Sequence, residues 1–257
     1  SKAANYDGWV GAVTIQAMAA ILDEAQLATG TRLLDVACGP GYGAGFAAGR
    51  GAKAIGLDYA PNMVTEAASR FPQAEFREGD AEKLPFPDGV FERVICAFGL
   101  LHFADPDQAI AEAYRVLAPD GRFVFSIWAG PAHHGFLSLV TSAIQAHGNP
   151  DIDLPLGPSR FRFSNESECC WTLAGAGFAD ISMATLYLDW HATSPQDFLD
   201  LIYKSTVRTA TLLEHQEAAA RERIHQAILD GAAQFKRGDD YTSTWPALMV
   251  SATKPAS

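Results

Sequence analysis

Short apolar runs alternate with amphipathic stretches through the first half of the chain, a pattern typical of strands that alternate with helices. The apolar runs predict strands over residues 32–36, 52–58, 74–80, 91–98 and 122–128. The stretches around them predict helices over about 11–28, 42–49, 61–69 and 107–117, and residues 119–121 predict a turn before the fifth strand. This order favours βαβ units, so we expect an α/β fold.

The pattern changes beyond residue 130. It predicts helices over 136–147, 166–174, about 195–209 and 214–236, strands over 181–190 and 242–252, and a Pro- and Gly-rich loop over 148–164. We expect one domain over residues 1–257 with a doubly wound, mostly parallel, seven-stranded Rossmann-like sheet that has helices on both faces. Its parts would be an N-terminal helical segment over 1–29, a ligand-binding core over 30–130, and insertions over 131–164 and 193–238 that form a helical cap.

Four glycines follow the first predicted strand within seven residues, at positions 39, 41, 43 and 45. Because glycine has no Cβ, the backbone here can lie directly against a ligand, and the amides that start the next helix point to the same place. The run Gly39-Pro40-Gly41-Tyr42-Gly43-Ala44 also matches the G-x-G-x-x-A pattern of dinucleotide-binding folds. The segment therefore predicts a site for an adenosine ligand and leaves open which one.

Three successive strands are predicted to end in an aspartate, namely Asp35, Asp58 and Asp80. In a parallel sheet the carboxyl ends of the strands share one edge, and ligands collect outside that edge. Each aspartate could alternatively do no more than cap the turn that follows it. Three in succession favour a ligand site.

Composition excludes some classes of partner. The formal net charge of −11 argues against nucleic acid, because phosphate binding needs a basic face. No stretch has the pattern of a signal peptide and no apolar run is as long as a membrane span, so we expect a cytoplasmic protein. Cys38, Cys96, Cys169 and Cys170 lack the spacing of metal ligands, and we expect reduced thiols and no metal site.

Five ordered motifs within residues 32–128 resemble those of class I S-adenosylmethionine-dependent methyltransferases, in the subgroup similar to ubiquinone/menaquinone C-methyltransferases. The matching segments are Leu34–Gly41, Gly56-Leu57-Asp58, Gly79–Phe86, Phe91–His102 and Glu112–Gly121. A NAD-binding fold would explain the glycines and Asp58, but neither Gly79-Asp80-Ala81 nor the segment from Arg115 to Gly121. The resemblance implies S-adenosylmethionine as cofactor and S-adenosylhomocysteine as product.

The resemblance also implies a role for individual residues. Asp58 would accept hydrogen bonds from both ribose hydroxyls, since a carboxylate has two oxygens. Asp80 would accept from the adenine amino group, and the Ala81 N–H would donate to a ring nitrogen. The turn with Gly39, Gly41 and Gly43 would hold the methionine part, Asp35 would offset its positive charge, and the Ala97 carbonyl would receive its amine.

Four aromatic or sulfur-containing residues are further candidates for cofactor contact. Tyr59 follows Asp58 directly, and Met63 could pack on the adenine or belong to the core. Tyr6 and Trp9 sit where relatives have a mobile N-terminal segment that closes over the cofactor. Ordinary packing is the alternative for both.

Methyl transfer from a sulfonium needs alignment and the exclusion of water, and it needs a base only where the acceptor must lose a proton. His102, just past the fourth strand, is the first candidate base, and His133 and His134, just past the fifth, are the next. A packing or orienting role is the alternative for His102.

We expect the acceptor pocket to lie under the two insertions, whose aromatic residues, together with one at the end of the fifth strand, favour a small apolar or aromatic methyl acceptor, although such residues also form ordinary cores. They are Trp128, Phe136, Phe161, Phe163, Trp190 and Trp245. The predicted function is transfer of a methyl group from S-adenosylmethionine to O, C or N of a small organic molecule. Two alternatives are a fold relative that catalyses a non-methylating reaction such as a cyclisation, and a binding subunit without turnover.

Overall fold

The structure, a computed structural model, describes residues 9–130, 135–152, 161–206 and 208–256. The chain forms two compact units. The sheet unit comprises Thr14–Ala129, Pro158–Leu186 and Ala247–Ser257, and the helical unit comprises Ser1–Val13, Gly130–Gly157 and Tyr187–Pro246. Residues 161–164, which the sequence assigns to an insertion, thus group with the sheet unit.

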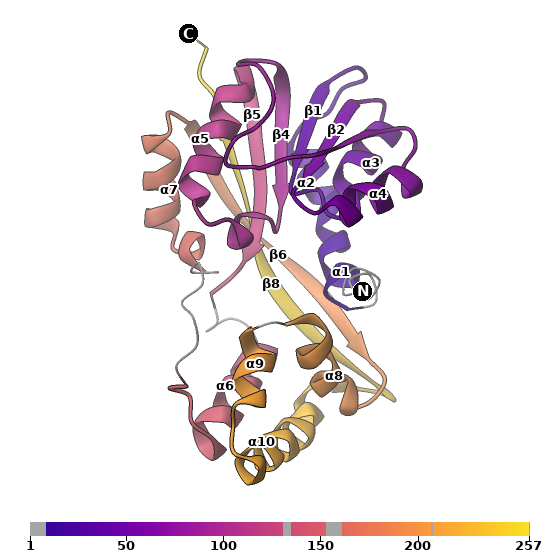
Figure 1. Cartoon of the computed structure of the whole chain (residues 1–257), viewed down its shortest axis with the longest axis vertical. Coiled ribbons are helices and arrows are strands. Elements are labelled where there is room, and N and C mark those ends of the chain that lie inside the picture. The colour runs from indigo at the N-terminus through magenta and orange to yellow at the C-terminus, as the bar shows by residue number, and fades with distance from the viewer. Residues whose placement is uncertain (1–8, 131–134, 153–160, 207, 257) are drawn as a thin grey trace. The chain divides into compact units, whose positions relative to one another are not determined.

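Eight strands within the described residues form one sheet, and seven of them follow the order β3-β2-β1-β4-β5-β8-β6 (Figure 1). Their bounds are β1 (Arg32–Val36), β2 (Lys53–Asp58), β3 (Glu75–Glu78), β4 (Phe91–Ala97), β5 (Leu117–Trp128), β6 (Ala179–Ala192), β7 (Lys236–Arg237) and β8 (Asp240–Thr253). The first five pair in parallel, β5 and β8 pair antiparallel, and β7 pairs with β8. The predicted mostly parallel sheet is confirmed, and the short β7 is an addition to it.

Helices cover both faces of the sheet in the sheet unit, as predicted (Figure 1). They are α2 (Met18–Glu24), α3 (Tyr42–Gly49), α4 (Pro61–Arg70), α5 (Pro106–Val116) and α7 (Glu166–Gly175). α1 (Val10–Thr14) and a 3-10 turn (Ile15–Ala17) precede α2, so the helix predicted over 11–28 is interrupted and ends at Glu24. α4 and α5 each begin with a proline, whose missing N–H costs nothing in a first helical turn.

β5 begins at Leu117, ahead of the strand predicted from residue 122. The predicted turn over residues 119–121 is instead an irregularity inside the strand, where the register with β4 shifts and Asp120 has a φ of 60°. The Asp120 N–H donates to the Lys254 carbonyl, and the Lys254 N–H donates to the Gly121 carbonyl. These partners lie far along the chain, so the local sequence alone predicts a turn.

Aromatic side chains form the core of the helical unit. Its helices are α6 (Gly135–His147), α8 (Gln196–Ser205), α9 (Arg208–Glu214) and α10 (Ala218–Gly231), and a 3-10 turn (Ala232–Phe235) follows α10. Phe136 and Trp245 stack with ring centroids 5.7 Å apart, and Trp190 meets Phe198 edge-on at 4.9 Å. All four rings are buried. Phe136, Trp190 and Trp245 therefore have core packing in this unit, and their contact with an acceptor stays a prediction.

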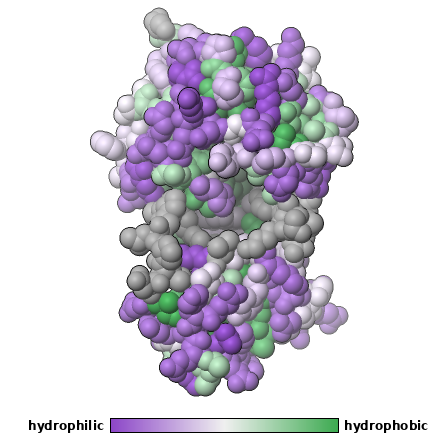
Figure 2. Space-filling view, in the orientation of Figure 1, coloured by the Kyte–Doolittle hydropathy of each residue, from purple (hydrophilic) through white to green (hydrophobic). Residues whose placement is uncertain are grey.

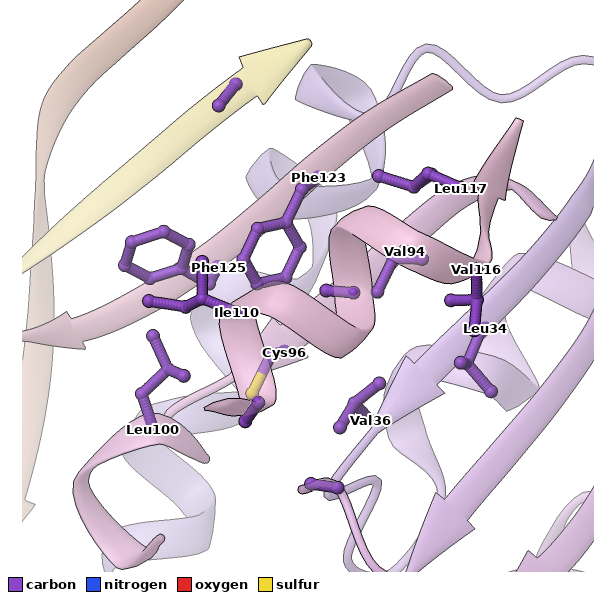
Figure 3. Packing of buried hydrophobic residues seen from close by; sticks show 14 of the residues in the cluster. Leu34, Val36, Val94, Cys96, Leu100, Ile110, Val116, Leu117, Phe123 and Phe125 are labelled. Atoms are coloured by element: carbon purple, nitrogen blue, oxygen red, sulfur yellow. The ribbon is translucent and has the colours of Figure 1, made fainter. Parts of the chain in front are cut away.

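The core of the sheet unit lies on one face of the central strands, because successive residues of a strand point to opposite faces. Leu34 and Val36 of β1 and Val94 and Cys96 of β4 pack with residues of α5, among them Ile110 (Figure 3). Phe163 also belongs to this core, and its contact with an acceptor stays a prediction.

The surface carries few large apolar features. Figure 2 shows mostly hydrophilic side chains on the visible described surface, with small separate hydrophobic patches. No described helix is long and apolar enough to cross a membrane. Cys38, Cys96, Cys169 and Cys170 are free thiols, as the sequence predicts.

Asp35 of β1 is a buried carboxylate on the sheet face opposite to this core. It is 1% exposed, and its Oδ2 accepts a hydrogen bond of 2.8 Å from the N–H of Ala44 in the first turn of α3. The positive end of the helix dipole favours a carboxylate there. Gly43 permits the approach, since a Cβ at that position would lie 2.5 Å from the same oxygen. Burial, with a smaller contribution from the charge of Asp58, raises the pKa of Asp35 to about 7.

The substitution Asp35→Asn should change how stability depends on pH. The carboxyl titrates near 3.8 in the unfolded chain and at about 7 in the folded protein, so the folded state loses stability as the pH rises between these values. At about 1.4 kcal/mol per pKa unit, the loss at pH 8 is on the order of 4 kcal/mol. Asparagine keeps an acceptor for the Ala44 N–H and escapes this loss.

Urea unfolding of both proteins from pH 4 to pH 8 measures the effect. The variant should gain stability relative to the wild-type protein as the pH rises towards 7, and the difference should then level off. Stability curves that run parallel over this range would contradict a raised pKa for Asp35.

Candidate functional site

The turn after β1 leaves open space beside the backbone of Gly39. Gly39 and Gly41 have φ values of 51° and 87°, in the left-handed region that favours glycine. A Cβ at Gly39 would meet no atom of the described residues within 4 Å, whereas one at Gly41 would lie 2.7 Å from the Cβ of Ala67 in α4. The Gly41 N–H donates to the Cys38 carbonyl and closes the turn. Gly41 thus packs the turn onto the protein, and Gly39 presents backbone to open space.

Asp58, the last residue of β2, holds this turn with its carboxylate. Oδ2 accepts from the Gly39 N–H at 2.8 Å, and Oδ1 accepts from the Ala60 N–H at 2.9 Å. Each carboxylate oxygen has two lone pairs, and the side chain is only half-buried, so acceptor capacity remains on both oxygens. Asp58 therefore caps the turn that follows it and keeps the pair of acceptors that a vicinal diol needs.

Asp80 lies at the same edge of the sheet, because the Gly79 N–H donates to the Asp58 carbonyl. Its side chain is exposed, and Oδ1 accepts from the Glu82 N–H at 2.9 Å in the manner of an Asx turn. Ala81 between them is buried. Asp80 therefore combines a local capping bond with an accessible carboxylate.

Two residues of α5 fix the loop that follows Asp80. The Leu84 N–H donates to Glu112 at 2.7 Å, and the Arg115 guanidinium donates to the carbonyls of Leu84 and Phe86 at 3.0 and 2.8 Å. Arg115 also donates two hydrogen bonds to Glu112, at 2.7 and 2.8 Å. These bonds raise the pKa of Arg115 and lower the pKa of Glu112. Through Glu112 and Arg115, the motif Glu112–Gly121 that the sequence analysis singled out thus holds the backbone of the loop after Asp80 in place.

The end of β4 carries an aromatic pair beside Ala97. Ala97 is the last residue of β4, and the chain turns at Phe98 with a φ of 55°. The Phe98 N–H is shared between the carbonyl oxygen and the Oγ of Ser126 on β5, at 3.0 and 3.2 Å. The Phe98 ring lies 4.4 Å from that of the half-buried Trp128, centroid to centroid. Sequence reasoning missed Phe98 and Ser126, because a left-handed phenylalanine has no signature in the sequence.

The other predicted residues of the sheet unit differ in exposure. Tyr59 is 78% exposed, and Met63 on α4 is half-buried. His102 is exposed at the end of the 3-10 turn Leu100–His102, where its backbone N–H donates to the Gly99 carbonyl. Tyr59 and His102 are therefore accessible to a ligand at this edge of the sheet.

The structure describes one of the four remaining predicted residues, Trp9. Trp9 packs within the helical unit, where its ring centroid is 6.5 Å from that of Trp190 and where it lies over the Lys204 ammonium at 5.0 Å. Tyr6, His133 and His134 lie outside the described residues. In the described part of the chain, no group of three or more His, Cys, Asp or Glu side chains could hold a metal ion.

The strand-end residues together suit a ligand with a diol and a positive charge. Gly39 and Asp58 are joined by a hydrogen bond, and the charge of Asp58 acts on Asp35. A cation beside Asp35 would favour its charged form and offset the cost of its burial. The edge thus offers accessible acceptors on Asp58 and Asp80 and a buried carboxylate, Asp35, that accepts a hydrogen bond from the Ala44 N–H.

Comparison with known proteins identifies the family. The methyltransferase-domain family matches residues 34–125. The demethylmenaquinone methyltransferase of Thermus thermophilus is 43% identical over 111 residues, which are 41% of this chain and 50% of that relative. The same-named protein of Mycolicibacterium vanbaalenii is 30% identical over 171 residues, 63% of this chain and 74% of that relative. The YcgJ protein of Bacillus subtilis aligns with a TM-score of 0.63 at 21% identity, over 94% of this chain and 99% of that one.

The chain therefore spans about half of the Thermus relative and about three quarters of the Mycolicibacterium relative. The likeness to YcgJ, at its low identity, shows the fold. The matched family region contains the glycine turn, Asp35, Asp58, Asp80 and Ala97, together with the whole Glu112–Gly121 motif and its Arg115. On these grounds the chain belongs to the class I S-adenosylmethionine-dependent methyltransferases.

Proposed function

We propose that this chain transfers the methyl group of S-adenosylmethionine to O, C or N of a small organic acceptor and releases S-adenosylhomocysteine. The observation that carries the proposal is the bond from the Gly39 N–H to Asp58 beside the buried Asp35. This contact joins the glycine turn to the Asp58 carboxylate, and the bond from the Ala44 N–H to Asp35 joins the helix that follows the turn to a second carboxylate.

The adenosine part would lie against β2 and β3. Asp58 would accept from both ribose hydroxyls, using the lone pairs that its bonds to backbone N–H groups leave. Asp80 would accept from the adenine amino group, and the Ala81 N–H would donate to a ring nitrogen. Tyr59 and Met63 would flank the adenine, a role that the exposure of Tyr59 supports.

The methionine part would lie against β1 and β4. The turn with Gly39, Gly41 and Gly43 would face it with backbone, and Ala97 would offer its carbonyl to the amine. Asp35 would face the positive charge, which accounts for a carboxylate buried at that position.

The cofactor would supply a methyl group on a sulfonium, from which a neutral thioether is a good leaving group. The chain's residues would hold the acceptor atom in line with the bond from the methyl group to sulfur and would exclude water. Such positioning can lower the activation barrier by up to about 7–11 kcal/mol. Where the acceptor is a phenol or an enolisable carbon, His102 would accept its proton. This role is supported by the exposure of His102 just past β4. His133 and His134 stay predictions, since they lie outside the described residues.

An apolar or aromatic acceptor is the class that the strand ends support. The ring of Trp128 is half-buried at the end of β5 and packs on the buried Phe98, which follows Ala97, so Trp128 is the aromatic group that supports this class. Because the relatives are named for demethylmenaquinone, a quinol is the first acceptor to test. The free thiols suit a reducing compartment, and we propose the cytoplasm as the place of action.

Removing the ribose acceptor should weaken cofactor binding. Asp58→Ala loses two charge-assisted hydrogen bonds, each worth about 1.5–3 kcal/mol, so the affinity for S-adenosylhomocysteine should fall at least a hundredfold. Asp58→Asn keeps one acceptor for the Gly39 N–H and should lose less. Asp80→Ala should weaken binding about tenfold or more.

Calorimetric titration measures these affinities, and Asp239→Ala, at an exposed position of the helical unit, serves as the matched control. The control should bind as the wild-type protein does. Unchanged affinity in both Asp58→Ala and Asp80→Ala would overturn the assignment of the site.

Transfer of the methyl group itself separates the proposal from its alternatives. With methyl-labelled S-adenosylmethionine and a panel of quinols, phenols and amines, label should enter an organic product and S-adenosylhomocysteine should accumulate in equal amount. A protein that catalyses a cyclisation, or one that only binds, would hold the cofactor and transfer no label from it to any acceptor in cell extract.

A further inference from the structure

Two residues in the left-handed backbone region end neighbouring strands. Ala37 follows β1 with a φ of 56°, and Phe98 follows β4 with a φ of 55°. Neither is glycine, and this conformation costs a residue with a Cβ about 1–2 kcal/mol. β1 and β4 pair in parallel, so both turns lie at the carboxyl edge of the sheet. Backbone strain that the surrounding structure maintains is typical of functional sites.

Each of these turns is anchored to the strand on its far side. After Ala37, the Cys38 N–H donates to the Leu57 carbonyl of β2 at 3.0 Å. The Phe98 N–H donates to the carbonyl and the hydroxyl of Ser126 on β5, and Ser126 is fully buried. The outer neighbours β2 and β5 therefore hold the two strained turns. The distance between the turns depends on the residues that pack between them.

Gly99 is the point at which the two turns meet. A Cβ at this position would lie 2.8 Å from the Cβ of Ala37 and 2.6 Å from the Sγ of Cys96, closer than real Cβ atoms approach. Gly99 itself has φ −87° and ψ −41°, values that any residue adopts. Glycine is therefore required at position 99 because a side chain would clash with these neighbours, and not because of the backbone conformation.

The two contacts differ in how they could be relieved. The Cys96 sulfur ends a side chain that can rotate, whereas the Ala37 Cβ is fixed to its backbone. An alanine at position 99 would therefore be accommodated chiefly by moving the turn after β4 away from the turn after β1. That movement would change the distance between Ala97 and the backbone of Gly39.

We propose that Gly99 is a positioning residue that sets the spacing between the turns after β1 and β4, and with it the site for the methionine part of the cofactor. The proposal rests on the proposed function, in which the Ala97 carbonyl and the Gly39 backbone both face that part. Gly99 acts through these turns and does not itself contact the cofactor.

A double-mutant cycle tests the proposal, with S-adenosylhomocysteine as the ligand in calorimetry and thermal unfolding as the measure of folding. Gly99→Ala should bind at least tenfold more weakly than the wild-type protein. In the Ala37→Gly background, which removes the fixed Cβ, adding Gly99→Ala should weaken binding less than threefold. Gly175→Ala, where a Cβ would meet open space, should bind as the wild-type protein does.

A further variant separates positioning from a general distortion of β4. Cys96→Ala relieves only the contact within β4, so binding by Cys96→Ala/Gly99→Ala should stay weak. The proposal would be overturned if this variant regained affinity for S-adenosylhomocysteine while Ala37→Gly/Gly99→Ala did not. It would also be overturned by a folded Gly99→Ala that binds within threefold of the wild-type protein.

The remaining outcomes are also decisive. If Gly99→Ala does not fold, Ala37→Gly/Gly99→Ala must fold and bind within threefold of Ala37→Gly, and its failure to do so overturns the proposal. A wild-type protein that binds no S-adenosylhomocysteine would instead refute the proposed function. If the wild-type protein binds normally and the effects of Ala37→Gly and Gly99→Ala on binding are independent, only the role of Gly99 is refuted and the proposed function stands.

Discussion

The contact between the Asp35 carboxylate and the first turn of α3 sets the geometry of the strand-end site. A carboxylate that is 1% exposed needs donors close at hand, and the Ala44 N–H meets it at 2.8 Å. Only a glycine at position 43 leaves room for that approach. The start of α3, and with it the turn over Gly39 and Gly41, is thereby held against the end of β1. One backbone hydrogen bond does not offset the burial, which is why the pKa stays raised at about 7 and why a cation is the partner that suits the position.

The rest of the edge is built by contacts of the same kind, in which side chains of one element fix the backbone of the next. Asp58 holds Gly39, Arg115 and Glu112 hold the loop after Asp80, and Ser126 holds the turn at Phe98. These supports all belong to the sheet unit. The helical unit has its own aromatic core, in which rings such as Phe136 and Trp245 stack on one another and stabilise that unit.

Local pattern predicts the strands, most helices and the three strand-end aspartates, because period, turn residues and glycine spacing are short-range signals. Features that depend on distant partners escaped it. β5 extends back to Leu117 because the chain after β8 bonds to it, and Phe98 is left-handed because Ser126 on another strand receives its N–H. Composition could not predict that Phe136 and Trp245 stack on each other, since the fold determines which side chains are buried together.

Proton exchange on cofactor binding tests the central claim, that Asp35 faces the positive charge of S-adenosylmethionine, most directly. Calorimetric titration at pH 7 in two buffers of different ionisation enthalpy gives the number of protons exchanged. With a pKa of about 7 in the free protein, Asp35 should release roughly half a proton when the cation lowers that pKa. The wild-type protein should therefore release more protons than Asp35→Asn by about this amount. Equal proton exchange in the two proteins would contradict the account.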